Sequence, residues 1–221
     1  MVDTSLQRKN MVESQVRPSD VTDRRITLAM SSIAREAFVA PELRALAYSD
    51  AELPLGDGRT KGRQLLAPRT LAKMIQILSP DPSDIVLDVG CGTGYATAIL
   101  SRLAMTVVAL EEDQGLAQEA TRVLQVQGFD NAAVVQGPLT DGYPSEGPYD
   151  RILVGGAVAE PPATLLGQLK DGGRLVAILA SGGSSRAVTW TRIGTTYSES
   201  DGFDAVAPLL PGFAKSPGFV F

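Results

Sequence analysis

The sequence of 221 residues contains no histidine and only one cysteine. Without histidine, Ser-His-Asp and Cys-His catalysis are excluded, as is every metal site with an imidazole ligand, and we expect no metal site. One cysteine cannot form a disulfide framework, and residues 1–5 show no secretory pattern, so we expect a cytoplasmic protein. No apolar run approaches the length that spans a membrane, and we expect no membrane partner. Any chemistry must therefore proceed without an imidazole base.

Positive charge is also scarce, because 20 Lys and Arg stand against 25 Asp and Glu, which gives a net charge of −5. Binding to a nucleic-acid backbone needs clustered basic residues, so we expect no nucleic-acid partner. One local basic run is the exception, and a solvated loop explains it at least as well. The run consists of Arg59, Lys61, Arg63 and Arg69.

A glycine-rich turn is the most informative stretch of the chain. Residues 85–89 form an apolar, partly β-branched run, which predicts a buried parallel strand, and a helical pattern begins at Tyr95. Glycines suit the turn between them because the chain bends sharply and a ligand must approach bare backbone. The turn supplies the candidate cofactor-binding residues Gly90, Cys91, Gly92, Thr93 and Gly94.

The spacing of the glycines separates two kinds of cofactor. A dinucleotide-binding turn needs its third glycine five positions after the first, and this chain has Tyr95 there. The pattern D-x-G-x-G-x-G, which begins at Asp88, instead resembles the first motif of S-adenosylmethionine-dependent methyltransferases. A purely structural turn is the alternative. Asp88 is a candidate for holding the amino-acid end of the cofactor, directly or through water, or else it organises the loop as a buried carboxylate.

Glu111 provides an independent test of this interpretation. It lies 21 positions after Gly90, at the end of the predicted strand 106–111. Ligands of open α/β sheets bind at the carboxyl ends of the strands, where a carboxylate can accept both ribose hydroxyls. The alternative is a helix-capping charge shared with Glu112 and Asp113, and we assign the ribose to Glu111 and the cap to Asp113. Cys91 has no histidine to activate it and is predicted to be a spacer, so no catalytic residue is assigned.

Strand and helix patterns alternate after residue 83, which predicts a Rossmann-like, mostly parallel, doubly wound sheet covered on both faces. A C-terminal antiparallel hairpin and an N-terminal helical extension complete this fold. The expected strands are 85–89, 106–111, 132–136, 149–154 and 174–179, with a hairpin of 187–193 and 196–200. The expected helices are 21–30 capped by Asp20, 31–38, 42–48, 68–78, 113–127 and 162–170, with a loop at 53–64 and a coil from 208 onward.

Several stretches together resemble the protein-L-isoaspartate O-methyltransferase family, namely residues 85–98, 107–111, 149–157 and 169–176, with further similarity at 38–41 and 53–56. The resemblance implies one methyltransferase domain over residues 1–221, with N-terminal helices and an acceptor loop in 1–82 and the cofactor-binding core in 83–221. It further implies that S-adenosylmethionine donates a methyl group to the α-carboxylate of an isoaspartyl residue in a peptide or protein. Such a carboxylate is ionised at neutral pH and needs no general base.

Two departures from the family pattern fall at the implied site. The family's acceptor loop reads Thr-Ile-Ser-x-Pro, and here Leu66 stands in place of the serine, two residues before Pro68. Leucine cannot donate a hydrogen bond to a carboxylate. The family's Gly-Asp-Gly that holds adenine reads Gly137-Pro138-Leu139, which leaves adenine to backbone groups and apolar contact with Pro138 and Leu139. The substrate-side candidates are Leu66, Pro68 and Gly155, and the alternative function is a homologue with another acceptor or a non-catalytic, regulatory role.

Overall fold

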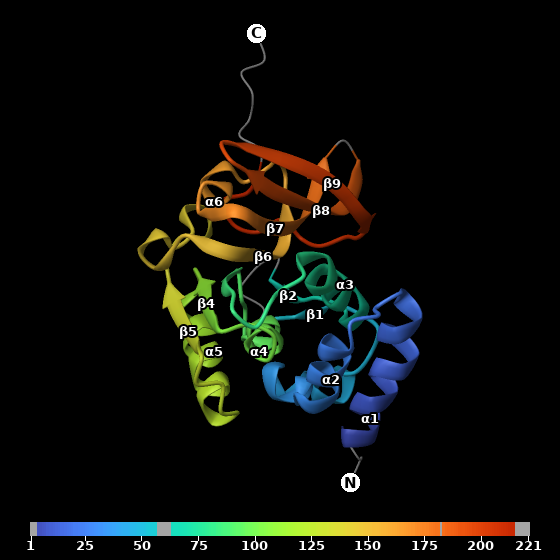
Figure 1. Cartoon of the computed structure of the whole chain (residues 1–221). Helices are drawn as coiled ribbons and strands as arrows, with labels where there is room; N and C mark the ends of the chain where they lie inside the picture. The colour runs from blue at the N-terminus through green and yellow to red at the C-terminus, as the bar shows by residue number, and fades with distance from the viewer. Residues whose placement is uncertain (1–3, 57–62, 182, 215–221) are drawn as a thin grey trace.

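The computed structural model describes residues 4–56, 63–181 and 183–214. Its central feature is a seven-stranded sheet in the order β5-β4-β3-β6-β7-β8-β9 (Figure 1). The strands from β5 to β7 run parallel, and β8 and β9 continue the sheet antiparallel. This arrangement confirms the predicted fold class. The strands are β3 (Ile85–Val89), β4 (Thr106–Glu111), β5 (Ala132–Gln136), β6 (Tyr149–Val158), β7 (Leu169–Ser181), β8 (Ser184–Ile193) and β9 (Thr196–Asp204).

The two faces of the sheet are covered unequally. Alternate residues of each parallel strand point to opposite faces, so Val86 of β3 joins one hydrophobic cluster and Leu87 the other. The first cluster packs under the long helices α3 (Pro68–Leu78), α4 (Tyr95–Ser101) and α5 (Gln114–Val126). The second lies under the short helix α6 (Ala163–Leu166), the turns η5 (Leu139–Asp141) and η6 (Pro144–Glu146), and the chain around Leu210. Among the described residues, no helix combines the length and apolar character needed to cross a membrane.

The ends of α5 and α3 follow the sequence signals. The side chain of Asp113 accepts a hydrogen bond from the Leu116 amide at 2.9 Å and caps α5, as predicted. Beyond the last turn of this helix, Gly128 takes a positive φ of 73°. Pro68 occupies the first position of α3, where its missing amide hydrogen leaves no bond unmade, and the apolar face of this helix is buried.

The N-terminal helices pack beside α3 and α4 (Figure 1). The prediction of a helix at 21–30 capped by Asp20 is wrong. Asp20 has a left-handed φ of 62°, and Asp23 caps the helix instead by accepting from the Arg25 amide at 2.8 Å. The predicted helix at 31–38 is replaced by the end of α2 and a short turn. The elements are α1 (Thr4–Met11), η1 (Val12–Val16), η2 (Arg17–Ser19), α2 (Arg24–Ser32), η3 (Arg35–Phe38) and η4 (Pro41–Leu46).

The prediction of a helix at 162–170 is also wrong. Only Ala163–Leu166 is helical, because Leu169 pairs with Tyr149 and begins β7. Leu169 is fully buried, so its place in the sheet removes more apolar surface from water than an exposed last helical turn would. The hairpin of β8 and β9 is confirmed and is longer than predicted. Trp190 of β8 is buried, and its ring N–H donates to Glu199 Oε2 of β9 at 2.7 Å.

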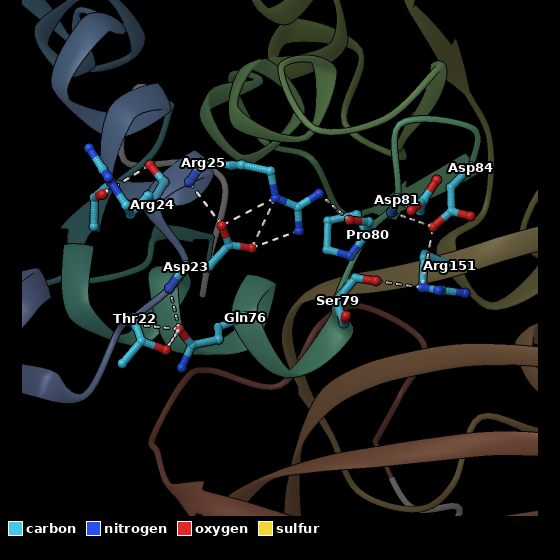
Figure 2. A network of polar contacts seen from close by, with 11 residues as sticks. Thr22, Asp23, Arg24, Arg25, Gln76, Ser79, Pro80, Asp81, Asp84 and Arg151 are labelled. Atoms are coloured by element: carbon cyan, nitrogen blue, oxygen red, sulfur yellow. Dashed lines mark hydrogen bonds and ion pairs between the residues drawn. The ribbon is translucent and has the colours of Figure 1, made fainter.

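A polar network fixes the N-terminal helices to the edge of the sheet where the parallel strands begin (Figure 2). Arg25 of α2 pairs with Asp23 at 2.7 Å and donates to the Pro80 carbonyl at 3.1 Å. Arg151 of β6 donates to the Ser79 carbonyl at 3.1 Å and lies 3.4 Å from the Asp84 carboxylate. This amino edge of the sheet is therefore held by arginines that each serve several acceptors.

Two further segments lie against the opposite, carboxyl edge of the sheet. The segment 53–64, predicted as a loop, instead holds β1 (Leu53–Pro54) and the first residue of β2 (Gln64–Leu65), which pair in a small antiparallel ladder. Residues from 208, predicted as a coil, pack onto the sheet, since the Leu210 amide donates to the Ala157 carbonyl at 2.9 Å. The parts of both predictions that concern 57–62 and 215–221 lie outside the described residues. Both segments therefore reach the edge where the glycine-rich turn lies.

Candidate functional site

The glycine-rich turn lies between β3 and α4, and its glycines are required by the backbone. Gly90, Gly92 and Gly94 have φ values of 74°, 59° and 95°, a region in which side chains other than glycine are strained. Space is short as well, because a Cβ atom on Gly92 would lie 2.4 Å from Leu55 Cδ1. The Gly90 amide donates to the Leu110 carbonyl at 2.8 Å, which ties the turn to the end of β4. The turn is thus a fixed strip of glycine backbone, with the Leu55 side chain packed against it.

Glu111 is the buried carboxylate at the end of β4, with a side chain that is 1% exposed. Its Oε2 accepts from the Gly92 amide at 2.8 Å. Its Oε1 accepts from the amides of Glu112 and Asp113 at 3.0 and 3.1 Å. Three backbone donors therefore stabilise the charge and fix the orientation of the carboxylate next to the turn. Since Asp113 makes the helix cap, the side chain of Glu111 is not used for capping, and its ribose role stays a prediction.

Arg63 is buried, unlike an arginine of a solvated loop. Its side chain is 3% exposed, and its Nη2 donates to Glu111 Oε2 in a buried ion pair, so the solvated-loop interpretation does not apply to it. Arg69 is solvated as expected, with a side chain that is 55% exposed and pairs with Asp50 at 2.9 Å, but it lies in α3 and not in a loop. Arg59 and Lys61 lie outside the described residues. The only signal for burial was that Arg63 stands just before the apolar residues 65–67.

Asp88 lies beneath the turn and is fully buried. Its Oδ2 accepts from Thr97 Oγ1 of α4 at 2.7 Å, whereas its Oδ1 has no hydrogen-bond partner among the described residues. Burial raises the pKa of Asp88 to about 7, and the nearby charge of Glu111 adds to the effect. The bond to Thr97 fits the loop-organising role, and the second oxygen is an acceptor that the described residues leave unused.

The two residues between the glycines have different roles. Burial raises the pKa of the Cys91 thiol well above its ordinary value, so the thiol stays protonated, as expected of a spacer. Thr93 Oγ1 donates to the Phe38 carbonyl at 2.5 Å and joins the turn to η3. The turn is therefore anchored on the N-terminal helical layer as well as on β4.

The acceptor-side candidates separate in the structure. Leu66 is 4% exposed and belongs to the hydrophobic core, while its carbonyl accepts from Nη2 of the buried Arg35 at 2.8 Å. Pro68 is buried at the start of α3. Gly155 of β6 does adjoin the turn, because a Cβ atom there would lie 2.7 Å from the Gly90 carbonyl oxygen. The structure thus brings Gly155 and Gly90 together and directs the side chain of Leu66 into the core.

A cavity of about 410 Å³ opens beside Glu111. Neither Pro138, which is exposed, nor Leu139, which is fully buried in the second hydrophobic cluster, is among its lining residues. Sequence reasoning missed Gln136 at the end of β5 and Pro211 near the C-terminus, which carry no motif signal. The lining residues are Arg63, Glu111, Glu112, Asp113, Gln114, Gln136 and Pro211.

These residues fit a nucleoside cofactor and do not fit a metal. Bare backbone at the turn, a fixed carboxylate at the next strand end and an unpartnered carboxylate oxygen on Asp88 offer the contacts that a ribose and an ammonium group need. In the part of the chain that is described, no group of three or more His, Cys, Asp or Glu side chains is placed to hold a metal ion. The fold and this site define an S-adenosylmethionine-dependent methyltransferase.

Comparison with known proteins agrees with this class and narrows it. The family model of protein-L-isoaspartate(D-aspartate) O-methyltransferase matches residues 6–202. The protein-L-isoaspartate O-methyltransferase of Herpetosiphon aurantiacus is 38% identical over 194 residues, which cover 88% of this chain and 85% of the relative. That of Roseiflexus castenholzii is 36% identical, with 96% of each chain covered. A solved protein-L-isoaspartate O-methyltransferase superposes with a TM-score of 0.81 at 25% identity, over 93% of this chain and 66% of the other.

The chain therefore belongs to the protein-L-isoaspartate(D-aspartate) O-methyltransferase family. This confirms the resemblance found in the sequence. The alternative of a non-catalytic, regulatory protein is not favoured.

Proposed function

We propose that this protein transfers the methyl group of S-adenosylmethionine to the α-carboxylate of an isoaspartyl residue in a peptide or protein. The observation that supports it best is the Glu111 carboxylate, which three backbone amides hold in one orientation at the wall of a cavity beside the glycine-rich turn. A carboxylate in this position can accept from ribose hydroxyls in place of the Arg63 guanidinium.

Each part of the donor has a proposed contact. Glu111 accepts from the ribose hydroxyls, and Asp88 uses its unpartnered oxygen for the amino group, directly or through water. Gly90 and Gly92 carry no side chains of their own, and the donor would take the place of the Arg63 and Leu55 side chains that lie against them in this structure. The segment from Gly137 to Leu139 would bound the adenine by backbone groups and by apolar contact with Pro138.

The reaction asks the protein mainly for orientation. When bound, the cofactor supplies a methyl group that its sulfonium centre activates. The acceptor carboxylate is ionised at neutral pH, so the reaction needs no general base and can proceed without histidine. The protonated, buried thiol of Cys91 takes no part. The work of the chain is to exclude water and to hold the donor and the acceptor in line.

Incubation with methyl-labelled S-adenosylmethionine and a matched pair of isoaspartyl and aspartyl peptides tests the proposal. We expect label in the isoaspartyl peptide only, and equal labelling of both peptides or of neither would contradict it. Glu111→Gln should weaken the binding of S-adenosylhomocysteine in calorimetry by about tenfold or more, since a charge-assisted contact is lost. Glu146→Gln, which changes an exposed carboxylate in η6, is the matched control and should bind as the wild type does.

The proposed location is the cytoplasm. Cys91 is a free, buried thiol, and a chain with a single free cysteine is typical of a reducing compartment.

A further inference from the structure

The Arg63 guanidinium is placed by the ladder of β1 and β2. The Arg63 carbonyl accepts from the Leu55 amide at 3.0 Å, directly beside the pairing of Pro54 with Gln64. From this anchor the side chain reaches the glycine-rich turn. A Cβ atom on Gly90 would lie 3.1 and 3.3 Å from the two terminal nitrogens of Arg63. The guanidinium therefore lies directly on the backbone of the proposed donor site.

This buried cation is incompletely satisfied. Its Nε has no hydrogen-bond partner among the described residues, and Glu111 is its ion-pair partner. A guanidinium has five N–H donors, and a buried one usually has most of them paired. The unpaired donor of this 97% buried charged group can still receive an acceptor, and doing so would relieve the cost of burying it without a partner.

Arg63 and the ribose of the proposed cofactor both bind the same group, the carboxylate of Glu111. Glu111 Oε2 already accepts from Arg63 and from the Gly92 amide. Ribose hydroxyls that donate to the same oxygen compete with the guanidinium. This inference rests on the proposed function: when the cofactor binds, its ribose hydroxyls release Arg63 from Glu111.

The Arg63 guanidinium lies beside the glycine-rich turn, and the acceptor-side candidate Gly155 lies against the same turn. Arg63 adjoins Gly90, and Gly90 adjoins Gly155, the acceptor-side candidate within β6. Leu66 offers no hydroxyl, and its side chain is in the core. A guanidinium matches the two oxygens of a carboxylate with two parallel N–H groups, which fixes both the position and the angle of the acceptor.

We propose that Arg63 is the acceptor-binding residue of this enzyme: it pairs with Glu111 before the cofactor binds and with the acceptor's α-carboxylate afterwards. The exchange makes the binding order donor first, acceptor second. In this proposal Arg63, three positions before Leu66, binds the acceptor in place of the family's serine.

The test compares Arg63→Gln with the wild type, with Arg63→Lys as a charge-conserving variant and Arg69→Gln as a control. Arg69 is an exposed arginine on the adjoining helix α3. Calorimetry gives the Kd of S-adenosylhomocysteine, and labelled transfer to the isoaspartyl peptide gives KM and kcat. For Arg63→Gln we expect the KM of the peptide to rise about ten- to a hundredfold, the loss of a charged hydrogen bond. Binding of S-adenosylhomocysteine should be as tight as in the wild type or tighter, because a competitor for Glu111 is gone.

Arg63→Lys keeps the positive charge but lacks the two parallel N–H groups of the guanidinium, so its KM for the peptide should lie between those of the wild type and Arg63→Gln. If Arg63→Gln does not fold, Arg63→Lys takes its place in the test. Arg69→Gln should match the wild type in both measurements. Weaker S-adenosylhomocysteine binding with an unchanged peptide KM would overturn the proposal and leave Arg63 as a counter-ion of Glu111. A wild type that binds no S-adenosylhomocysteine would overturn the proposed function itself. One that binds it without methylating the peptide would overturn the acceptor half of that function together with the role of Arg63.

Discussion

The two edges of the parallel sheet each hold arginines and carboxylates, and they differ in how completely these are paired. At the amino edge, Arg25 serves both Asp23 and the Pro80 carbonyl, and Arg151 serves the Ser79 carbonyl and Asp84 (Figure 2). At the carboxyl edge, Arg63 leaves its Nε without a partner among the described residues. There Asp88 also keeps one oxygen unpaired and has a raised pKa.

This difference separates polar groups that hold the fold from polar groups that are kept for a ligand. Native structures pair nearly all buried polar atoms, so each exception calls for an explanation. The same residue types are therefore interpreted differently at the two edges. At the amino edge the arginines bind several acceptors of the protein, which indicates a structural role, and at the carboxyl edge the unpaired atoms of Arg63 and Asp88 support a role in recognition.

The largest effect should come from breaking the buried pair at the carboxyl edge. Glu111→Ala leaves the Arg63 charge buried without its counter-ion, and we expect the free energy of unfolding to fall by about 3 to 5 kcal/mol. Denaturant unfolding measures this. The double variant with Arg63→Met should recover part of the loss, and a double variant as unstable as Glu111→Ala would show that the charge is not the cause.

The next effect should come from the turn itself. Gly92→Ala combines a positive φ with a Cβ that meets Leu55, so it should lower the free energy of unfolding by about 2 to 4 kcal/mol and weaken S-adenosylhomocysteine binding. Gly172→Ala in β7 is the matched control, since it has a φ of 77° and nothing within 4 Å of the new Cβ. It should cost about 1 to 2 kcal/mol and leave binding unchanged. Equal loss of binding in both variants would remove the turn from the site.

A third prediction concerns pH and the unpaired oxygen of Asp88. Its pKa of about 7 lies above the ordinary 3.8, so the native state binds the extra proton in this interval. The resulting stability is fully present below about pH 4 and is lost as the pH rises to about 7. Relative to Asp88→Asn, the wild type should therefore lose on the order of 1 kcal/mol per pH unit across this range and no more above it. Unfolding free energies of both proteins from pH 5 to 8 measure this, and a constant difference would show that Asp88 is ionised throughout.

The smallest effect should appear at the amino edge. Asp23→Ala removes the cap of α2, and we expect a loss of about 1 kcal/mol, visible as a lower denaturation midpoint. Binding of S-adenosylhomocysteine should stay as in the wild type, because this network does not touch the cavity. A change in Kd would mean that the two edges are coupled and that the comparison between them is too simple.

The sheet could be predicted from the sequence because its signals are local. The apolar runs, the glycine spacing and the cap at Asp113 each act within a few residues, and the structure has them where the patterns put them. Predictions failed where a long-range contact decided the outcome. Leu169 left its helical pattern to pair with β6, and Asp20 lost the cap to Asp23.

The candidate site divides in the same way. The glycines and Glu111 belong to motifs, so sequence spacing locates them. Arg63 belongs to no motif, and its burial follows from a partner 48 residues further along the chain, which charge counting cannot reveal. Gln136 and Pro211 reach the cavity only because the strand order places β5 next to β4 and because the chain after residue 208 returns to the carboxyl edge.

The hydrogen bond from Arg35 to the Leu66 carbonyl bears on the order in which parts of the chain fold. The glycine-rich turn, its helix and Glu111 lie within one strand-helix-strand unit, residues 85–111, so the donor half needs only a short loop to close. The acceptor segment is fixed by the bond from Arg35 to the Leu66 carbonyl, which spans 31 residues, and by the contact of Arg63 with Glu111, which spans 48. Longer closures cost more chain entropy and come later in folding. The half of the site that we propose for the donor should therefore form earlier in folding than the half that we propose for the acceptor.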